Sequence, residues 1–244
     1  MIVENELLGV PKLKIYQDPD MFNFSLDSIL LANFVQIRKN DKKILDMGCG
    51  NAPIPLYLTL KTSAKITGIE IQKDVFELAK KSVEANSLES QIDLINDDYK
   101  NLDKYFSDGY FDQIVVNPPF FKVKEGSNLN DSEYKTIARH EVFATLDDII
   151  NIASHKLKFR GILNMVHRPD RLDEIIVTLN KYGFTLKRLR FVYPKEGSIC
   201  NHILIEAMNK GSFGGLKILN PLNIYDNFGN YTEETLKIYN GIVD

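Results

Sequence analysis

The sequence is short of several features that would place it in a specialised class of protein. It has two cysteines, Cys49 and Cys200, among 244 residues, too few for a disulfide framework or a cysteine-based metal cluster. No apolar run is long enough to span a bilayer, and the acidic first residues lack the basic start and apolar core of a secretory signal. We therefore expect a cytoplasmic protein with reduced thiols, no membrane association and no metal.

A strong excess of one charge is also missing, because the formal net charge is −3. A protein that coats nucleic acid without specificity needs clustered Lys and Arg side chains. Local basic stretches do occur in the C-terminal half, at 156–171 and 187–195. They are as consistent with solvated surfaces as with a structured RNA partner, so composition permits RNA without indicating it.

From Lys42 onward, short apolar runs alternate with segments of helical periodicity. This alternation is typical of strands joined by crossover helices, with the clearest helix at about 72–86. The last two predicted strands are separated only by 194–201, which is too short for a helical crossover and indicates an antiparallel hairpin. The predicted fold is α/β and Rossmann-like, a mainly parallel seven-stranded sheet with an antiparallel edge hairpin and helices on both faces. The predicted strands are 43–47, 65–70, 92–95, 111–116, 161–166, 186–192 and 202–207.

No Gly/Ser-rich or Pro-rich linker divides the chain, so we expect one domain over 1–244. It would comprise an N-terminal cover at 1–41, a core at 42–210 and a C-terminal extension at 211–244 with a capping strand and helix. In the cover, Ser25 is placed to cap a helix. A second expected helix spans 168–182. The polar stretch 121–141 is longer than most connections and predicts a functional or mobile loop.

The first motif is a glycine-containing loop after the first core strand, at Asp46-Met47-Gly48-Cys49-Gly50. Glycines without side chains let the backbone approach a bound nucleotide closely. A dinucleotide-binding fingerprint would have a third glycine or alanine where this chain has Pro53, which argues against NAD. Glu70, at the tip of the second strand, suits the two hydroxyls of a ribose.

The acidic residues around this loop favour S-adenosylmethionine as the cofactor. Asp46 is placed to orient the positively charged amino-acid end of a sulfonium cofactor. Asp97 and Asp98 follow the third strand, where a carboxylate or the nearby backbone can meet an adenine amino group. Any one of these acids is also consistent with a surface acid at a strand end. Three strand ends that each have an acid, beside a Gly-x-Gly loop, favour a binding site.

The second motif, Asn117-Pro118-Pro119-Phe120, follows the fourth strand. The lone pair of an aromatic or amide amino nitrogen is delocalised, so the nitrogen attacks only when acceptors hold its N–H groups. The Asn117 side-chain oxygen and the Pro118 carbonyl are two such acceptors. Phe120, with Phe121 as a second candidate, offers a flat face for a planar base. In-line attack on a sulfonium methyl group then depends on positioning and needs no general base. By itself, Asn-Pro-Pro is equally typical of a stiff turn.

Together the two motifs resemble those of the class I amino-methyltransferases, which implies the class I methyltransferase fold. Over nearly the whole chain, further segments are similar to the bacterial tRNA1(Val) adenine-37 N6-methyltransferases. The segments with this similarity are 22–34, Ala138-Arg139-His140-Glu141, His167-Arg168-Pro169-Asp170-Arg171-Leu172, Pro221-Leu222 with Tyr225, and Tyr231-Thr232-Glu233-Glu234.

The resemblance implies that S-adenosylmethionine donates a methyl group to the N6 of an adenine beside a tRNA anticodon. The tRNA anticodon stem-loop would be the partner, and a monomer is favoured. Phe22, Phe24 and Asp27 would close over the methionine end of the cofactor. The cofactor-binding candidates are Phe24, Asp27, Asp46, Gly48, Gly50, Glu70, Ile71, Asp97, Asp98 and Asn117, and the catalytic candidates are Asn117, Pro118, Pro119 and Phe120.

The candidates for substrate binding are Phe121, Arg139, His140, Arg168 and Arg171. Arg139 and His140, with Glu141, are equally consistent with bracing the polar loop. His167 ends a strand and, without a metal partner, is expected to be a structural or substrate-edge residue rather than a catalyst.

Several alternatives stay open at this point. Release-factor methyltransferases methylate a protein glutamine amide with a similar pocket, but here little chain precedes the cofactor loop for a separate recognition domain. A ribosomal-RNA amino-methyltransferase, acting on guanine N2 or adenine N6, is a second alternative. DNA adenine methylation would require an additional target-recognition segment, and none is evident. A non-catalytic module that binds the cofactor or RNA is the alternative outside enzymes, although such a module has no need of paired acceptors.

Overall fold

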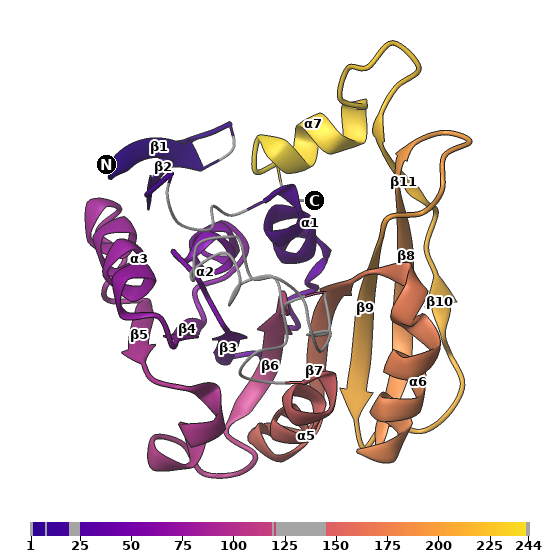
Figure 1. The fold of residues 1–244 in the computed structure, drawn as a ribbon. Coiled ribbons are helices and arrows are strands. Elements are labelled where there is room, and N and C mark those ends of the chain that lie inside the picture. Colours follow the sequence, from indigo (N-terminus) through magenta and orange to yellow (C-terminus); the bar gives the residue numbers. More distant parts are fainter. Residues whose placement is uncertain (1, 8, 20–24, 119, 121–144, 243–244) are drawn as a thin grey trace, which may run out of the picture.

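A single central sheet organises the molecule in the computed structural model, which describes residues 2–7, 9–19, 25–118, 120 and 145–242 (Figure 1). The strand order is β10-β8-β9-β7-β6-β3-β4-β5, and β11 pairs with β8. Strands β3 to β7 are mutually parallel, whereas β9 is antiparallel to both of its neighbours, β7 and β8. The strands are β3 (Lys43–Met47), β4 (Lys65–Glu70), β5 (Ile92–Asn96), β6 (Phe111–Val116), β7 (Leu157–His167), β8 (Phe184–Lys195), β9 (His202–Asn209), β10 (Lys217–Ile218) and β11 (Leu222–Tyr225).

The predicted fold class is confirmed, including the antiparallel β8–β9 hairpin. The sheet has nine strands instead of the predicted seven, because β10 and β11 of the C-terminal extension add to β8. A separate hairpin of β1 (Val3–Leu7) and β2 (Val10–Gln17) was not predicted. Its second strand is held to a helix by backbone bonds with Asn86 and Ser82, which are contacts between distant parts of the chain.

Helices cover both faces of the sheet, which explains why the strands are almost continuously apolar. Successive residues of a strand point to opposite faces, so Ile44 packs into one buried cluster and Leu45 into the other. The first face is covered by α1 (Leu26–Phe34), α2 (Pro53–Leu58), α3 (Lys73–Ala85) and α7 (Glu233–Tyr239). The second face is covered by the 3₁₀ helix η1 (Tyr99–Lys104), by α5 (Leu146–Lys156) and by α6 (Leu172–Lys181).

The predicted helices need two corrections, one to a boundary and one to a cap. The helix expected at 168–182 begins as a short 3₁₀ helix, η2 (Pro169–Arg171), and α6 proper begins at Leu172. Ser25 is the N-cap residue of α1, but its hydroxyl makes no cap hydrogen bond to a backbone N–H. Instead, Ser25 Oγ donates to Asp27 Oδ2 at 2.8 Å, which positions a predicted site residue.

The amino ends of β3 and β6 are joined by a dense set of polar contacts around Asp112. Its Oδ2 accepts hydrogen bonds from the backbone N–H groups of Lys42 and Lys43, at 2.9 and 3.0 Å, and Lys158 pairs with Oδ1. Burial disfavours the charged carboxylate, but the Lys158 ammonium and the two N–H groups outweigh it and lower the pKa of Asp112. The strand ends are therefore held by a fully partnered charge.

Asp41 extends these contacts along the same amino edge. Arg38 donates to Asp41 through Nε at 3.0 Å, and the buried Gln113 side chain also donates to Asp41. Gln113 in turn accepts from Asn164 Nδ2 of β7 at 2.8 Å. We call Asp41 and Asp112, with these partners, the amino-edge network.

The carboxyl ends of the parallel strands β3 to β7 lie together at the opposite edge of the sheet. The antiparallel strand β9 begins at this edge, because Ile203 pairs with His167, the last residue of β7. Segments far apart in the sequence are thereby brought to one place, and open α/β sheets bind their ligands at this edge. We call it the carboxyl edge.

Candidate active site

The loop after β3 has the conformation that its glycines predict. Gly48 and Gly50 have φ angles of 75° and 56°, in the left-handed region that favours glycine. A Cβ atom added at either position would meet nothing within 4 Å, so both glycines border open space. The N–H groups of Gly48 and Cys49 donate to the Ile69 carbonyl at 2.9 and 3.0 Å, which joins the loop to β4. Helix α2 begins at Pro53, where a proline is tolerated because the first helical N–H groups have no partner within the helix.

Two buried carboxylates lie beside this loop. Asp46 is fully buried, and neither of its oxygens has a hydrogen-bond partner in the described part of the chain. Glu70 accepts from the N–H of Gly50 at 2.9 Å and from the N–H of Gln72 at 2.9 Å. Burial raises the pKa of Asp46 well above its usual value, with repulsion from Glu70 as the second cause, and burial also raises the pKa of Glu70.

Unpartnered buried carboxylates are costly unless a positive ligand compensates them. The amino-acid end of S-adenosylmethionine has an ammonium group, whose positive charge would favour the ionised form of Asp46 and which the two carboxylate oxygens could bind. The open space at Gly48 and Gly50 allows close approach of a nucleoside. The residues present therefore fit S-adenosylmethionine, with Asp46 and the glycine loop as its holders.

The acids after β5 are already engaged in local hydrogen bonds. Asp97 accepts from Asn101 Nδ2 at 2.7 Å and from the Tyr105 hydroxyl at 2.9 Å, and these two bonds are the main causes that lower the pKa of Asp97 to about 2. Asp98 is the N-cap of η1 and accepts from the N–H of Lys100 at 2.9 Å. Ile71 follows Glu70 and exposes 37% of its surface. Contact of Asp97, Asp98 or Ile71 with the cofactor stays a prediction.

Asn117 directly follows β6 and is oriented by a residue of α1. Its Nδ2 donates to the Oγ of Ser28 at 3.1 Å, and Ser28 is buried. The amide nitrogen is thereby directed to the helix, and no described residue donates to the amide oxygen, Oδ1, which is an acceptor. Pro118 is buried next to it, whereas Pro119 lies outside the described residues.

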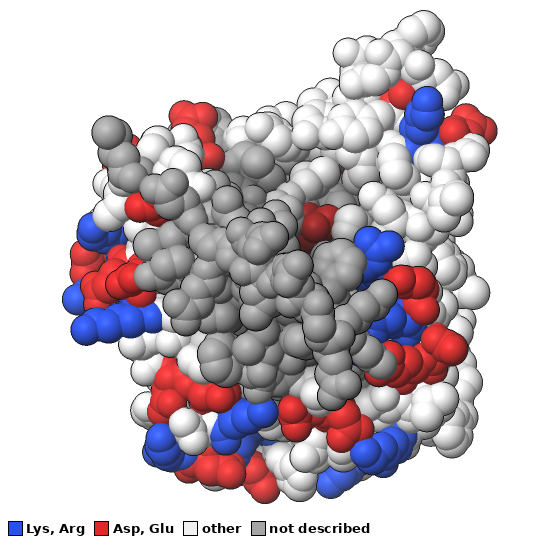
Figure 2. All heavy atoms as spheres, in the orientation of Figure 1, with Lys and Arg blue, Asp and Glu red and all other residues white. Residues whose placement is uncertain are grey.

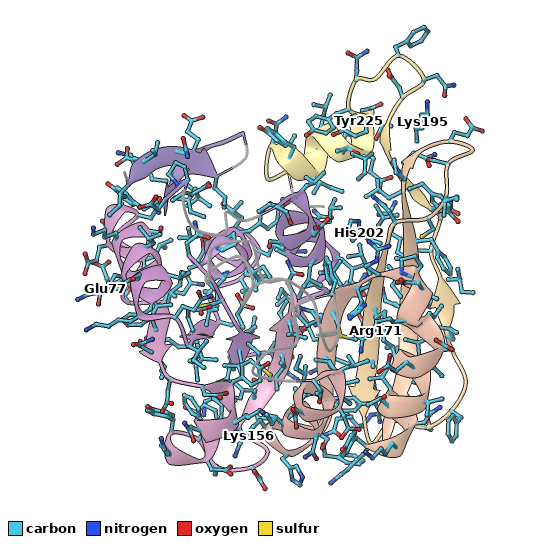
Figure 3. All side chains as sticks on the ribbon, in the orientation of Figure 1. Glu77, Lys156, Arg171, Lys195, His202 and Tyr225 are labelled. Carbon is cyan, nitrogen blue, oxygen red and sulfur yellow. The ribbon has the colours of Figure 1, made fainter. Side chains whose placement is uncertain are left out.

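Phe120 packs close to two imidazole rings. Its ring centroid is 5.5 Å from that of His167 and 5.7 Å from that of His202, both in tilted arrangements. His202, labelled in Figure 3, begins β9, and its Nε2 is 3.4 Å from Asp27 Oδ1 of α1. The loop after β6, the end of β7, the start of β9 and α1 therefore meet around one aromatic side chain.

His167 is fully buried and electrically neutral near pH 7. Its Nδ1 accepts a hydrogen bond from the N–H of Arg168 at 2.8 Å. Burial, and secondly the nearby charge of Arg171, lower its pKa to about 4. A neutral imidazole at this edge agrees with the expected structural or substrate-edge position.

The described candidates for substrate binding make contacts within their own segment. Arg171, which Figure 3 shows at the start of α6, is largely buried and makes two 3.0 Å bonds to Glu174. Arg168 is more exposed and its Nε lies 3.4 Å from Asp170. The predicted roles of Arg168 and Arg171 toward substrate stay predictions. Phe22, Phe24, Phe121, Arg139, His140 and Glu141 lie outside the described residues.

Two site residues were missed by the motif analysis. Ser28 lies inside the segment 22–34 that resembles the family, but a serine in an apolar helix gives no sign of what its hydroxyl contacts. His202 begins a predicted strand, and nothing local indicates its pairing with Asp27. Both residues act across the fold, where sequence spacing is uninformative.

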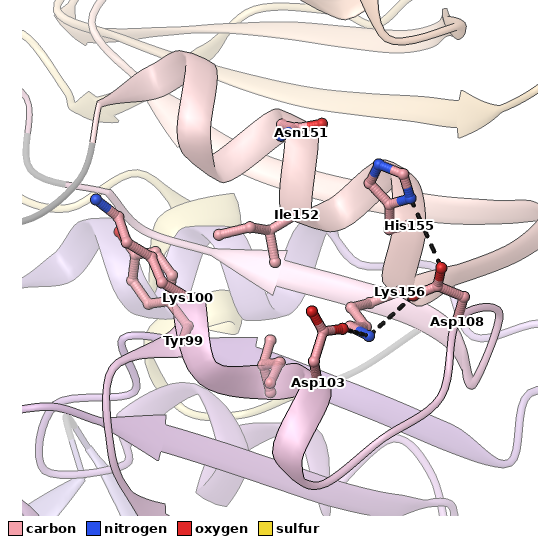
Figure 4. A pocket seen from close by; sticks show the side chains of 9 residues that line it. Tyr99, Lys100, Asp103, Asp108, Asn151, Ile152, His155 and Lys156 are labelled. Atoms are coloured by element: carbon pink, nitrogen blue, oxygen red, sulfur yellow. Dashed lines mark hydrogen bonds and ion pairs between the residues drawn. The ribbon is translucent and has the colours of Figure 1, made fainter.

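A hollow away from this site lies between η1 and the C-terminal half of α5 (Figure 4). It has a volume of about 340 Å³, and none of the predicted site residues lines it. Lys156 lies in its wall, with Nζ paired to Asp103 and, at 2.9 Å, to Asp108. Lys156 and these two carboxylates are therefore already paired with one another, as in a structural contact between η1 and α5.

Neither one-sided surface charge nor a metal cluster marks the site in the part of the chain that the structure describes. Figure 2 shows positive and negative side chains interspersed on the visible face. Among the described residues, no group of three or more His, Cys, Asp or Glu side chains is placed to hold a metal ion. In the same part of the chain, no helix is long and apolar enough to cross a membrane.

Comparison with known proteins agrees with this geometry. The family model of the methyltransferase small domain matches residues 12–177. A tRNA1(Val) (adenine(37)-N6)-methyltransferase of Porphyromonas gingivalis is 30% identical over 191 residues, covering 74% of this chain and 73% of the relative. The protein of the same name from Phocaeicola vulgatus is 25% identical, covering 82% and 83%.

Among solved structures, a predicted O-methyltransferase from Agrobacterium tumefaciens superposes with a TM-score of 0.71 at 21% identity, covering 89% of this chain and 97% of that one. That likeness concerns the fold. The predicted enzyme class, an S-adenosylmethionine-dependent methyltransferase, is confirmed. The chain belongs to the methyltransferase small domain family, and within it to the family of the tRNA1(Val) (adenine(37)-N6)-methyltransferases.

Proposed function

We propose that the protein methylates the N6 atom of adenine-37 in tRNA1(Val), with S-adenosylmethionine as the donor. The single observation behind this choice is the orientation of the Asn117 side chain, whose nitrogen donates to Ser28 at 3.1 Å and whose oxygen accepts from no described residue. This is the arrangement that an exocyclic amino group requires. The names of the relatives supply the tRNA and the position.

Catalysis is derived from what the chain's own residues do to the amino group. Asn117 Oδ1 and the Pro118 carbonyl accept its two N–H groups, which localises the lone pair on nitrogen. Ser28 keeps the amide from rotating, so the acceptor is oriented before the base arrives. When bound, S-adenosylmethionine supplies an electrophilic methyl group. The proton released by the amine leaves to water.

The target base must leave the stacked anticodon loop to reach these acceptors, as base-modifying enzymes require. Phe120 provides a flat face for it, and its position close to His167 and His202 limits the ring's freedom to turn. Stacking on an aromatic ring is worth about 1–3 kcal/mol per base. Part of the cost of extruding the base is offset in this way.

The direct test is methylation of defined substrates with labelled S-adenosylmethionine. Unmodified tRNA1(Val), the same transcript with guanine at position 37, ribosomal RNA and a release factor would be incubated separately. Mass spectrometry of nucleosides and peptides should find N6-methyladenosine in the first sample alone. Product in ribosomal RNA, or methylglutamine in the release factor, would instead support one of the alternatives left open above.

Replacing the acceptor isolates its contribution to this reaction. We expect Asn117→Ala to lower kcat by about 10³-fold, near the upper range for loss of one preorganised polar group. S-adenosylmethionine affinity, measured by calorimetry, should change by only about twofold, because Asp46 and the glycine loop are intact. Ser28→Ala is the matched variant and should lower kcat less, since it frees the amide without removing it. Unchanged kcat in Asn117→Ala would contradict the mechanism.

We also expect the enzyme to be a cytoplasmic monomer that holds the anticodon stem-loop of its tRNA. Light scattering of the protein with and without a stem-loop would measure both stoichiometries. A stable dimer would contradict the expectation for the free protein.

A further inference from the structure

His167 has a buried hydrogen-bond donor that the structure leaves unused. It is the last residue of β7, at the carboxyl edge, and its ring lies 5.5 Å from that of Phe120. The hydrogen bond from the N–H of Arg168 occupies Nδ1 as an acceptor. In a neutral imidazole the other nitrogen then holds the proton, so Nε2 is a donor.

No partner for this donor exists within the described residues. Nε2 of His167 is buried and lacks a hydrogen-bond acceptor, in a side chain that is fully buried. Most buried polar groups have a hydrogen-bond partner, and a ligand or an ordered water is one way in which an unpartnered group is completed. The low pKa, caused mainly by burial, keeps the ring neutral and this tautomer in place near pH 7.

The neighbouring imidazole, by contrast, has a partner. His202 lies at nearly the same distance from Phe120, 5.7 Å, but its Nε2 is paired with Asp27 at 3.4 Å. Two imidazoles therefore lie close to the ring on which the base is proposed to stack, and one of them offers a free N–H. A ligand that fits must present an acceptor atom there.

We propose that His167 determines specificity for adenine by donating its Nε2–H to a ring nitrogen next to the target amino group. The inference deepens the proposed function and rests on it. Adenine has unprotonated ring nitrogens, N1 and N7, on either side of its amino group, and both accept hydrogen bonds. Guanine has N–H at N1, which would face the His167 donor with a second donor. The bond from Arg168 fixes the proton of His167 on Nε2, and this donor would favour adenine over guanine as the target base.

The test replaces each acceptor atom of the base in turn. Anticodon stem-loops of tRNA1(Val) would contain adenosine, 1-deazaadenosine or 7-deazaadenosine at position 37, and kcat/KM for methylation would be measured. One of the two analogues should lower kcat/KM of the wild type by about tenfold, the value of one hydrogen bond with a buried donor left unpaired. If both analogues react like adenosine, the inference is overturned.

His167→Phe keeps an aromatic ring but has no donor. Measuring this variant with the same stem-loops gives a double-mutant cycle in which one change is in the protein and the other in the base. Its kcat/KM for adenosine should fall about tenfold, and the analogue that harmed the wild type should cause no further loss. If the analogue lowers kcat/KM of this variant as much as it lowers that of the wild type, the inference is overturned. His167→Gln restores an N–H donor and should recover part of the rate, and the comparison of analogues in the wild type decides the matter even if His167→Phe unfolds.

Failure of the proposed function looks different in the same experiment. If the wild type forms no N6-methyladenosine in any stem-loop or in full tRNA1(Val), the proposed substrate is wrong and the inference falls with it. If adenosine is methylated while the cycle shows no coupling, only the assignment of His167 is wrong. Binding of the stem-loops, followed by fluorescence anisotropy, gives a second readout that does not depend on turnover.

Discussion

The two edges of the central sheet treat buried ionisable groups in opposite ways. At the amino edge, Asp41 and Asp112 have a partner for each carboxylate oxygen. At the carboxyl edge, both oxygens of Asp46 and the Nε2 of His167 have none among the described residues. Asp41 and Asp112 are therefore fully partnered, whereas Asp46 and His167 retain buried atoms that a ligand could bind. Substitutions at the two edges should separate stability from function.

The largest expected effect on stability is at the amino edge. Asp112→Ala removes the acceptor of two backbone N–H groups and the partner of Lys158. We expect the free energy of unfolding to fall by about 3 kcal/mol, because two backbone N–H groups lose their acceptor, at a cost of about 1–3 kcal/mol for each unsatisfied buried group. Urea denaturation measures this loss. Affinity for S-adenosylmethionine should be unchanged below the melting temperature, and a large loss of affinity would show that the edges are not independent.

Asp46→Asn, at the carboxyl edge, should lower cofactor affinity without lowering stability. We expect cofactor affinity to fall by about 30-fold, about 2 kcal/mol, because a charge-assisted bond is lost. Because the pKa of Asp46 is raised by burial, its ionisation destabilises the folded state increasingly as the pH rises. The variant should therefore be more stable than the wild type, by more at pH 8 than at pH 5. Calorimetry and thermal melts measure the two effects, and a less stable variant at pH 8 would refute the comparison.

His167 predicts how the carboxyl edge responds to acid. Its folded-state pKa of about 4 lies below the ordinary value of 6.5, because burial and then Arg171 oppose its charge. The unfolded state binds the proton more readily, so stability is full above pH 6.5 and falls as the pH drops toward 4. Between pH 7 and pH 5 the wild type should lose about 2 kcal/mol more than His167→Phe. If the free energy of unfolding of the two proteins changes equally with pH, His167 is not the group that titrates.

The smallest effect is expected for the exposed partner at the amino edge. Lys158 exposes 44% of its side chain, so water screens its charge. We expect Lys158→Met to cost less than about 1 kcal/mol, because Asp112 keeps its two backbone donors. Urea denaturation of this variant beside Asp112→Ala separates the ion pair from the backbone hydrogen bonds. Equal losses in the two variants would assign the whole effect to the ion pair.

Local patterns predicted the strands and the two motifs because their determinants are neighbours in sequence. The run at 43–47 is apolar on both faces, and the conformations of Gly48 and Gly50 are properties of the loop itself. The β1–β2 hairpin was not predicted because its second strand depends on side chains of α3. Pairings of Ser28 with Asn117 and of His202 with Asp27 join distant segments, and only the fold brings them together.

Asp27 and Ser28, consecutive residues of α1, contact β9 and the loop after β6. One helix turn thus fixes the geometry of two segments that arrive from different parts of the chain. For protein engineering, this shared anchor couples the two halves of the enzyme. A redesign of α1 that moves Ser28 would release the Asn117 amide, and one that moves Asp27 would release His202, so changes to this helix turn affect both segments.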